Sequence, residues 1–106
     1  MKKTLIAAMI FSLSVGAAAD MSDYDLTDEE FCEVESEVAY EAMDTRQMGV
    51  PLHTALALSD NSQVKAIIHH AYEARQFQSE YAKEVIKVEF GKLNYYKCLA
   101  RMSGKL

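Results

Sequence analysis

Histidine and carboxylate side chains raise the first candidate chemistry, which is metal binding. His69 and Glu73 are four residues apart, so on a helix they would share one face and could offer two ligands. His53 would have to supply a third ligand, because His70 points about 100° away from His69 on a helix. Such a set would indicate a small metal-dependent enzyme, but solvent-exposed helix surface explains these residues more simply. We therefore expect no metal site and no cofactor.

A second pattern, Asp23-x-Asp25-x-Thr27, begins like a calcium-binding loop. Such a loop needs glycine at its sixth position and glutamate at its twelfth, where this chain has Asp28 and Val34. The sequence also contains no nucleophile elbow, no catalytic-triad order and no glycine loop that could hold a phosphate. With no catalytic residues to name, we expect a protein that is not an enzyme.

Charged residues on otherwise apolar helix faces suggest a candidate polar network of Glu35, Arg46 and Glu89. Glu35 and Arg46 fall within an apolar arc that contains Phe31, Cys32, Val38, Ala39 and Ala42. Glu89 falls within an arc of the last expected helix that contains Tyr81, Val85, Val88, Tyr96 and Leu99. Buried charges are costly unless paired, so Arg46 would bind a carboxylate or backbone carbonyls. Alternatively, both arcs are wide and the carboxylates lie at their margins.

Acidic and tyrosine side chains together suggest a surface for another protein. Residues 20–44 contain many acidic residues and no lysine or arginine, and six tyrosines are more than a small core needs. Partly exposed tyrosines on an acidic surface are typical of a protein-binding face. The residues proposed for this acidic face are Asp28, Glu29, Glu33, Glu37, Tyr40 and Tyr95. Packing of the tyrosines at the margin of the core is the alternative.

The elements that would position these residues are all helical. Thr27 and Glu30 have the spacing of a capping box at the start of the first helix. Apolar periodicity predicts helices from Asp28 to about Met48, from Leu52 to Ser59, from Gln63 to about Tyr72, and from Glu80 to Arg101. Residues 74–79 are polar and would bend or interrupt the chain. We predict an all-α fold, a small antiparallel bundle of three to four helices, and the last two long helices could be separate or one bent helix.

The first nineteen residues have the pattern of a secretory signal peptide. Lys2 and Lys3 precede an apolar run from Thr4 to Val15, and small residues follow up to Ala19. As a helix the run would be roughly 18 Å long, too short for the ~30 Å of a bilayer core. We therefore expect cleavage after residue 19, a single helical domain over residues 20–106, and no membrane insertion of the mature chain. A bacterial periplasm is the expected location.

Charge narrows the range of partners. Without the two signal lysines, nine basic residues face sixteen acidic ones, a formal net charge of 9 − 16 = −7. Such a chain is poorly suited to nucleic acid or anionic lipid, whose phosphates attract lysine and arginine clusters. A protein partner of this domain should instead be basic. The oligomeric state is left open by the sequence.

Cys32 and Cys98 are the two cysteines of the chain. In an oxidising compartment, a cysteine pair in a small domain indicates a disulfide. Two free thiols or a two-cysteine metal site are the alternatives, although neither cysteine has a Cys-x-x-Cys partner or a nearby histidine. A disulfide would require the start of the first helix to lie beside the end of the last, so these helices would run antiparallel.

Short motifs along the chain resemble a group of small exported, two-cysteine helical proteins of proteobacteria and their phages, which have no assigned function. The motifs are Cys32, Arg46-Gln47-x-Gly49-Val50, Ala71-Tyr72-Glu73, Glu89-Phe90 and Cys98. The resemblance implies a disulfide-linked helical domain and a shared role for the Arg-Gln-x-Gly turn, and it implies no activity. This chain departs from the pattern at Ala74-Arg75, where the group has a bend with proline.

Three classes of function remain after these exclusions. The favoured one is a non-enzymatic periplasmic binding protein, of the inhibitor, immunity or envelope-modulating type, that acts through the acidic face. The second is an acid-stress periplasmic chaperone, for which the many carboxylates provide a titratable surface. The third is the small metal-dependent enzyme considered above. The last two rest on analogy or on incomplete ligand sets.

Overall fold

The computed structural model describes residues 26–104, which form four helices and no strand. The helices are α2 (Asp28–Gln47), α3 (Leu52–Leu56), α4 (Ser62–Ala71) and α5 (Glu80–Met102). The predicted all-α bundle is therefore confirmed. The signal peptide predicted at residues 1–19 lies outside the described residues. None of the described helices is long and apolar enough to cross a membrane.

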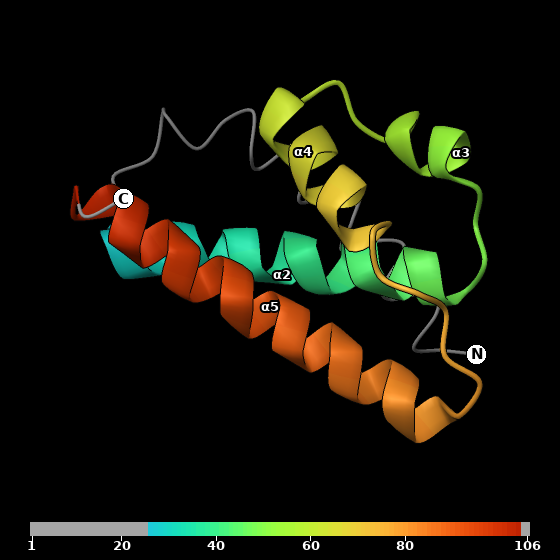
Figure 1. Ribbon diagram of the computed structural model, residues 1–106. Helices are drawn as coiled ribbons and strands as arrows, with labels where there is room; N and C mark the ends of the chain where they lie inside the picture. The colour runs from blue at the N-terminus through green and yellow to red at the C-terminus, as the bar shows by residue number, and fades with distance from the viewer. Residues whose placement is uncertain (1–25, 105–106) are drawn as a thin grey trace.

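Helix α2 is the central element of the bundle. It packs along α5, which runs antiparallel to it, and α4 packs on another side of α2, as Figure 1 shows. The short helix α3 lies next to α4 (Figure 1). The core between these helices consists of Val38, Ala39, Ala42, Met43, Ala55, Val64, Ile67, Ile68, Ala71 and Phe90.

Side-chain caps determine where the long helices begin. The Thr27 hydroxyl accepts a hydrogen bond from the Glu30 amide at 3.1 Å, and the Glu30 carboxylate accepts one from the Thr27 amide at 3.0 Å. This is the predicted capping box. Asn61 and Ser79 cap α4 and α5 in the simpler way, each by accepting from the backbone amide three residues ahead.

Three contacts, at successive positions along the helices, hold α2 against α5. Near one end, Cys32 and Cys98 form a buried disulfide with Cα atoms 5.5 Å apart, which confirms the predicted bond and the antiparallel arrangement. In the middle, the Ser36 hydroxyl donates to the Gly91 carbonyl at 2.9 Å. A Cβ at Gly91 would lie only 3.3 Å from the Ser36 carbonyl oxygen, so glycine permits this close approach. The third contact is the ion pair of Lys87 described below.

Helix α5 turns a different face inward from the one that its apolar residues predict. The predicted arc points outward: Tyr81, Val85, Val88 and Tyr96 are exposed, and so is Glu89. The buried residues are Phe90, Gly91, Asn94 and Cys98. The disulfide and the Gly91 contact set this orientation. Asn94 can be buried because its side-chain amide donates to the Phe90 carbonyl at 2.8 Å.

The chain between α4 and α5 is a separate connection, so these helices are not one bent helix. Gln47, at the end of α2, is buried. Both the nitrogen and the oxygen of its side-chain amide form hydrogen bonds to the backbone of this connection. Its nitrogen donates to the Arg75 carbonyl at 2.9 Å, and its oxygen accepts from the Phe77 amide at 2.8 Å. These two bonds tie the Arg-Gln-x-Gly turn to the interrupted segment that the sequence predicted.

Arg46 reinforces the same connection. Its Nε donates to the Ala74 carbonyl at 2.9 Å, and its guanidinium lies 5.3 Å from the centre of the Tyr72 ring. The Tyr72 hydroxyl in turn donates to the Val50 carbonyl at 2.6 Å. The sequence analysis proposed either a carboxylate or backbone carbonyls as the partner of Arg46. In the structure, Arg46 binds a backbone carbonyl.

Removing the disulfide should destabilise the bundle strongly. Cys32 and Cys98 are 66 positions apart, and closing such a loop is worth roughly 4 kcal/mol in the unfolded chain. We expect reduction, or the Cys32→Ala/Cys98→Ala variant, to lower the melting temperature by more than about 10 °C. Circular dichroism melts of oxidised and reduced protein measure this. Labelling of both thiols in native, oxidised protein would contradict the bond.

The Gln47 contacts should matter more for stability than the Arg46 contact. Gln47→Ala leaves a buried amide and a carbonyl without partners, so we expect it to lower the free energy of unfolding by about 2–3 kcal/mol. Arg46→Lys keeps the charge but loses the fixed donor and the contact with Tyr72, at a cost of about 1 kcal/mol. Urea unfolding of both variants measures the two losses of unfolding free energy. A larger loss for Arg46→Lys than for Gln47→Ala would contradict the prediction.

Candidate functional site

The acidic residues of the proposed face lie along one exposed side of α2. Glu29, Glu33 and Glu37 are spaced by four residues and are all exposed, so they form a row along the helix. Asp28 is exposed in the first turn. Within residues 26–104, none of the three carboxylates in the row takes part in an ion pair. Because like charges at this spacing repel each other, the row is unfavourable unless a cation approaches it.

Of the two tyrosines proposed for the acidic face, Tyr40 lies where α2 meets α5. Tyr40 is half-buried and its hydroxyl donates to the Glu84 carboxylate at 2.7 Å. Tyr95 is also half-buried and its ring meets the edge of Tyr96, with ring centres 5.3 Å apart. Both rings are thus held by neighbouring side chains. Tyr40 follows Glu37 by three residues on α2, so it borders the acidic row. Tyr95 lies on α5, and its ring contact is with Tyr96 of the same helix.

A polar cluster around Lys87 fixes the other end of this surface. Its Nζ lies 3.0 Å from Asp44 Oδ1 and 3.1 Å from Glu84 Oε1, and 5.3 Å from the centre of the Tyr40 ring. Burial alone would lower the pKa of Lys87, but the hydrogen bonds to both carboxylates outweigh it and raise the pKa. Burial and the Glu84 hydrogen bond raise the pKa of the Tyr40 hydroxyl. Lysine and tyrosine therefore both stay protonated at neutral pH.

Glu41, one turn before Thr45 on α2, is a buried carboxyl group beside this cluster. Burial is the main cause that raises its pKa from 4.5 to about 7, and the negative charge of Asp44 adds to the effect. The positive charge of Lys87 acts in the opposite direction. Among the acids of α2, Glu41 is therefore poised to change charge near neutral pH.

The structure does not bring Glu35, Arg46 and Glu89 together as one network. Glu35 is buried near the start of α2, where both its oxygens lie 2.9 and 3.0 Å from Nη2 of Arg101. Arg46 is near the other end of α2, and Glu89 is exposed on α5. The buried carboxylate that the sequence singled out thus has a partner at the end of α5 that the sequence analysis missed.

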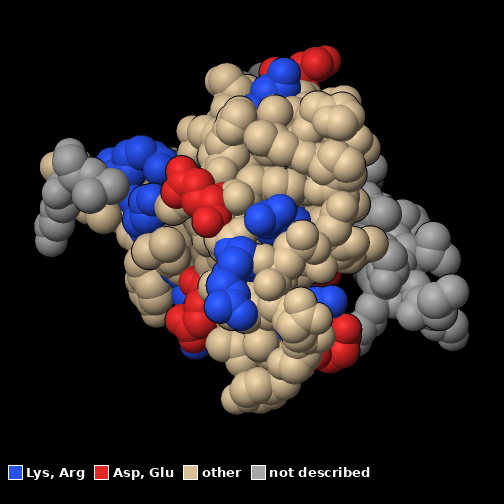
Figure 2. Space-filling model, turned by 45° about the vertical axis from the view of Figure 1, so that its right-hand side comes forward, with Lys and Arg blue, Asp and Glu red and all other residues tan. Residues whose placement is uncertain are grey.

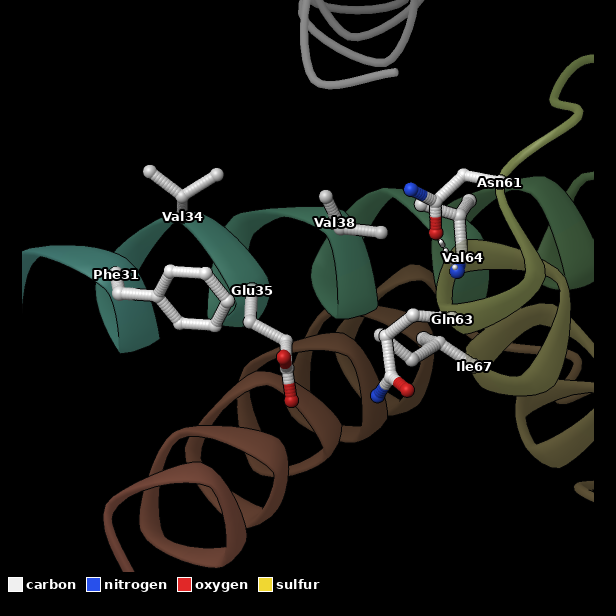
Figure 3. Close-up of a pocket in the computed structure, with 8 residues that line it drawn as sticks. All are labelled: Phe31, Val34, Glu35, Val38, Asn61, Gln63, Val64 and Ile67. Atoms are coloured by element: carbon white, nitrogen blue, oxygen red, sulfur yellow. Dashed lines mark hydrogen bonds between the residues drawn. The ribbon is translucent and has the colours of Figure 1, made fainter. Parts of the chain in front are cut away.

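A small hollow lies beside Glu35, between α2 and the start of α4 (Figure 3). Its volume is about 120 Å³, and its walls are Phe31, Val34, Glu35, Val38, Asn61, Gln63, Val64 and Ile67. An apolar cavity of about 150 Å³ can hold a benzene ring, so this hollow has room for one small apolar group. Figure 3 shows the Glu35 carboxylate directed toward α5, where Arg101 already binds it. We assign the hollow no catalytic role.

The candidate metal ligands are not assembled. Among the described residues, no three histidine, cysteine, aspartate or glutamate side chains form a group that could hold a metal ion. His53 and His69 are exposed, as is Glu73. His70 packs against Phe90 with ring centres 5.2 Å apart, which is a structural contact.

Charge is distributed unevenly over the bundle. In the view of Figure 2, basic and acidic side chains alternate over the lower part, so no patch of a single sign forms there. The upper part, below its top edge, is largely uncharged (Figure 2). Residues 47–59, which include α3, contain no acidic residue, lysine or arginine. Asp60, Glu73 and Glu89 are also exposed and outside these ion pairs, but among residues 26–104 the α2 row alone places three such carboxylates at four-residue spacing.

Comparison with known proteins identifies no relative from which a function could be transferred. No protein-family model matches the chain, and neither a curated protein nor a solved structure matches it. The resemblance to small exported two-cysteine proteins stays a prediction. The function must therefore be argued from the side chains described above.

Glu41 should make stability depend on pH. Its folded-state pKa of about 7 exceeds the ordinary 4.5, so between these values the folded state holds a proton that the unfolded state releases. The contribution of Glu41 to stability therefore falls as pH rises through this window. Glu41→Gln removes the cost of the buried charge and should raise the free energy of unfolding by about 1–3 kcal/mol at alkaline pH.

The same substitution should give no gain at pH 4 and below, where Glu41 is protonated in both states. Urea unfolding across the pH range measures the difference. Glu33→Gln, at an exposed position of the same helix whose charge does not act on the pKa of Glu41, is the matched control and should show no such dependence. A pH-independent effect of Glu41→Gln would contradict the raised pKa.

Proposed function

We propose that this chain is an exported, non-enzymatic protein of the periplasm that binds a basic protein through its acidic face. The observation that carries the proposal is the row of three exposed carboxylates on α2, none of them in an ion pair within residues 26–104. A basic partner would relieve the repulsion along this row. The half-buried ring of Tyr40 would add apolar contact area beside it.

The rigidity of the α2–α5 pair supports this proposal. The disulfide and the ion pair of Lys87 with Asp44 hold both helices in place. The acidic face therefore needs little ordering when a partner binds, which lowers the cost of association. The buried disulfide also suits an oxidising compartment. An inhibitor, an immunity protein or an envelope-modulating factor would each use such a surface.

Glu41 weighs against the alternative of an acid-stress chaperone. Such a chaperone has to loosen as pH falls, whereas protonation of Glu41 favours the folded state between its pKa of about 7 and the ordinary 4.5. Loosening would then have to begin at a pH below this window. Capture of many proteins only in acid is therefore the outcome that would replace the proposal.

Charge reversal on α2 tests the proposed binding face. Immobilised protein is exposed to periplasmic extract at neutral pH, at low and at high salt, and the retained proteins are identified. We expect a specific basic partner whose association is several-fold slower with Glu33→Lys/Glu37→Lys and is weakened by salt, because steering by exposed charges is screened. Neither position lies in the first turn of α2, so the fold should be unaffected.

A matched variant separates a local effect from a change in net charge. Asp60→Lys/Glu73→Lys alters the net charge by the same amount at two exposed positions outside α2. It should retain the partner nearly as well as the parent protein does. Equal losses with both variants, or retention that salt does not weaken, would overturn the proposed face.

A further inference from the structure

We infer that the outward side of α5 binds a second copy of this chain, with the two α5 helices antiparallel. The residues of this α5 stripe are Tyr81, Val85, Val88, Lys92, Tyr95 and Leu99. Tyr81 is 80% exposed, and Val85 and Val88 are 41% and 38% exposed. Figure 1 shows α5 on the outside of the bundle. The inference does not rest on the proposed function.

The spacing of the stripe is that of a helix-pairing seam. Its six members follow one another at intervals of four, three, four, three and four residues, which is the spacing of the core positions in paired helices. Five of the six are apolar or aromatic. The bundle buries a different face of α5, that of Phe90, Gly91, Asn94 and Cys98. Tyr81, Val85, Val88 and Lys92 of the seam are exposed, and Tyr95 and Leu99 are half-buried. A helix with two apolar faces, one of them exposed, indicates a second helix outside the chain.

The order of intervals favours a symmetric antiparallel pair. Read backwards, the intervals of the stripe are the same, with the centre between Val88 and Lys92. Two copies related by a two-fold axis at this centre place Tyr81 opposite Leu99, Val85 opposite Tyr95, and Val88 opposite Lys92. The same patch then serves both copies, as a two-fold interface requires.

Charge complementarity selects the antiparallel direction. Glu89 and Lys92 are both exposed at the centre of the stripe, and within residues 26–104 neither makes an ion pair to another helix. In the antiparallel pair, Glu89 of one copy lies next to Lys92 of the other, and the axis repeats this contact. In a parallel pair, Glu89 would face Glu89 of the other copy and Lys92 would face Lys92, so like charges would meet. The lone cation of the seam therefore has an anion to meet only in the antiparallel arrangement.

The size of the stripe predicts a modest affinity. The seam from Tyr81 to Leu99 is about 27 Å long at 1.5 Å per residue, and one helix pair buries less than the roughly 800 Å² per partner of a standard interface. We therefore expect a dimer that dissociates on dilution, rather than a permanent one.

Sedimentation over a wide range of concentrations tests this with the disulfide-bonded protein. The parent should pass from monomer to dimer, and Val85→Glu should be monomeric throughout. Glu89→Lys and Lys92→Glu should each weaken the dimer by about tenfold, because both contacts across the axis become repulsive. A mixture of these two single variants should form a heterodimer again. All these positions are exposed, and circular dichroism verifies that each variant is folded.

The outcomes separate this inference from its competitors. A parent protein that stays monomeric at all concentrations would overturn it, as would a dimer indifferent to Val85→Glu. A dimer that Val85→Glu disrupts but Glu89→Lys does not would refute the antiparallel direction. Glu33→Lys/Glu37→Lys should leave the dimer unchanged, so failure of the acidic face to bind a partner has no bearing on this result.

Discussion

The close antiparallel contact between α2 and α5 is the constraint on which the rest of the structure depends. A disulfide holds one end, the ion pair of Lys87 with Asp44 holds the other, and Gly91 lets the helix backbones approach in between. Covalent closure of a long loop removes much of the entropy of the unfolded chain, which a domain this small needs. Because the contact fixes the rotation of both helices, it also decides which side chains remain on the surface.

Buried polar groups in this bundle are compensated in two different ways. Glu35 and Gln47 each have partners from elsewhere in the chain, the first an arginine at the end of α5 and the second the backbone of residues 75 and 77. Such bonds offset the cost of removing polar atoms from water and fix the geometry of the α4–α5 connection. Glu41 is compensated instead by a raised pKa, which lets it be buried with its proton. The stability of the fold therefore depends on the charge of Glu41 near neutral pH.

Two surfaces of different chemistry result from the orientation of the long helices. The exposed side of α2 carries the acidic row, and the outward side of α5 carries the apolar stripe with Glu89 and Lys92 at its centre. The first suits a basic partner, because its charges lack internal counterparts. The second suits a copy of the same helix, because its spacing and charges complement themselves when reversed. Binding at both surfaces would present two acidic faces in one assembly and increase avidity for a partner with more than one basic site.

The sequence by itself determined the helices and the disulfide, because those depend on local or covalent signals. Thr27 and Ser79 mark helix starts through hydroxyls that accept from nearby backbone amides, and Gly49 marks a helix end through its positive φ. Two cysteines allow one pairing. Only the tertiary structure decided which face of α5 is buried and which partners Glu35 and Arg46 have. The apolar residues of α5 outnumber the small and polar ones that pack inward, so their average direction pointed to the wrong face. Counting turns back from Cys98 would have reached Asn94, Gly91 and Lys87 instead. The choice of face depends on how closely α2 can approach, and that distance arises from residues 55 positions apart, Ser36 and Gly91, which no local pattern connects.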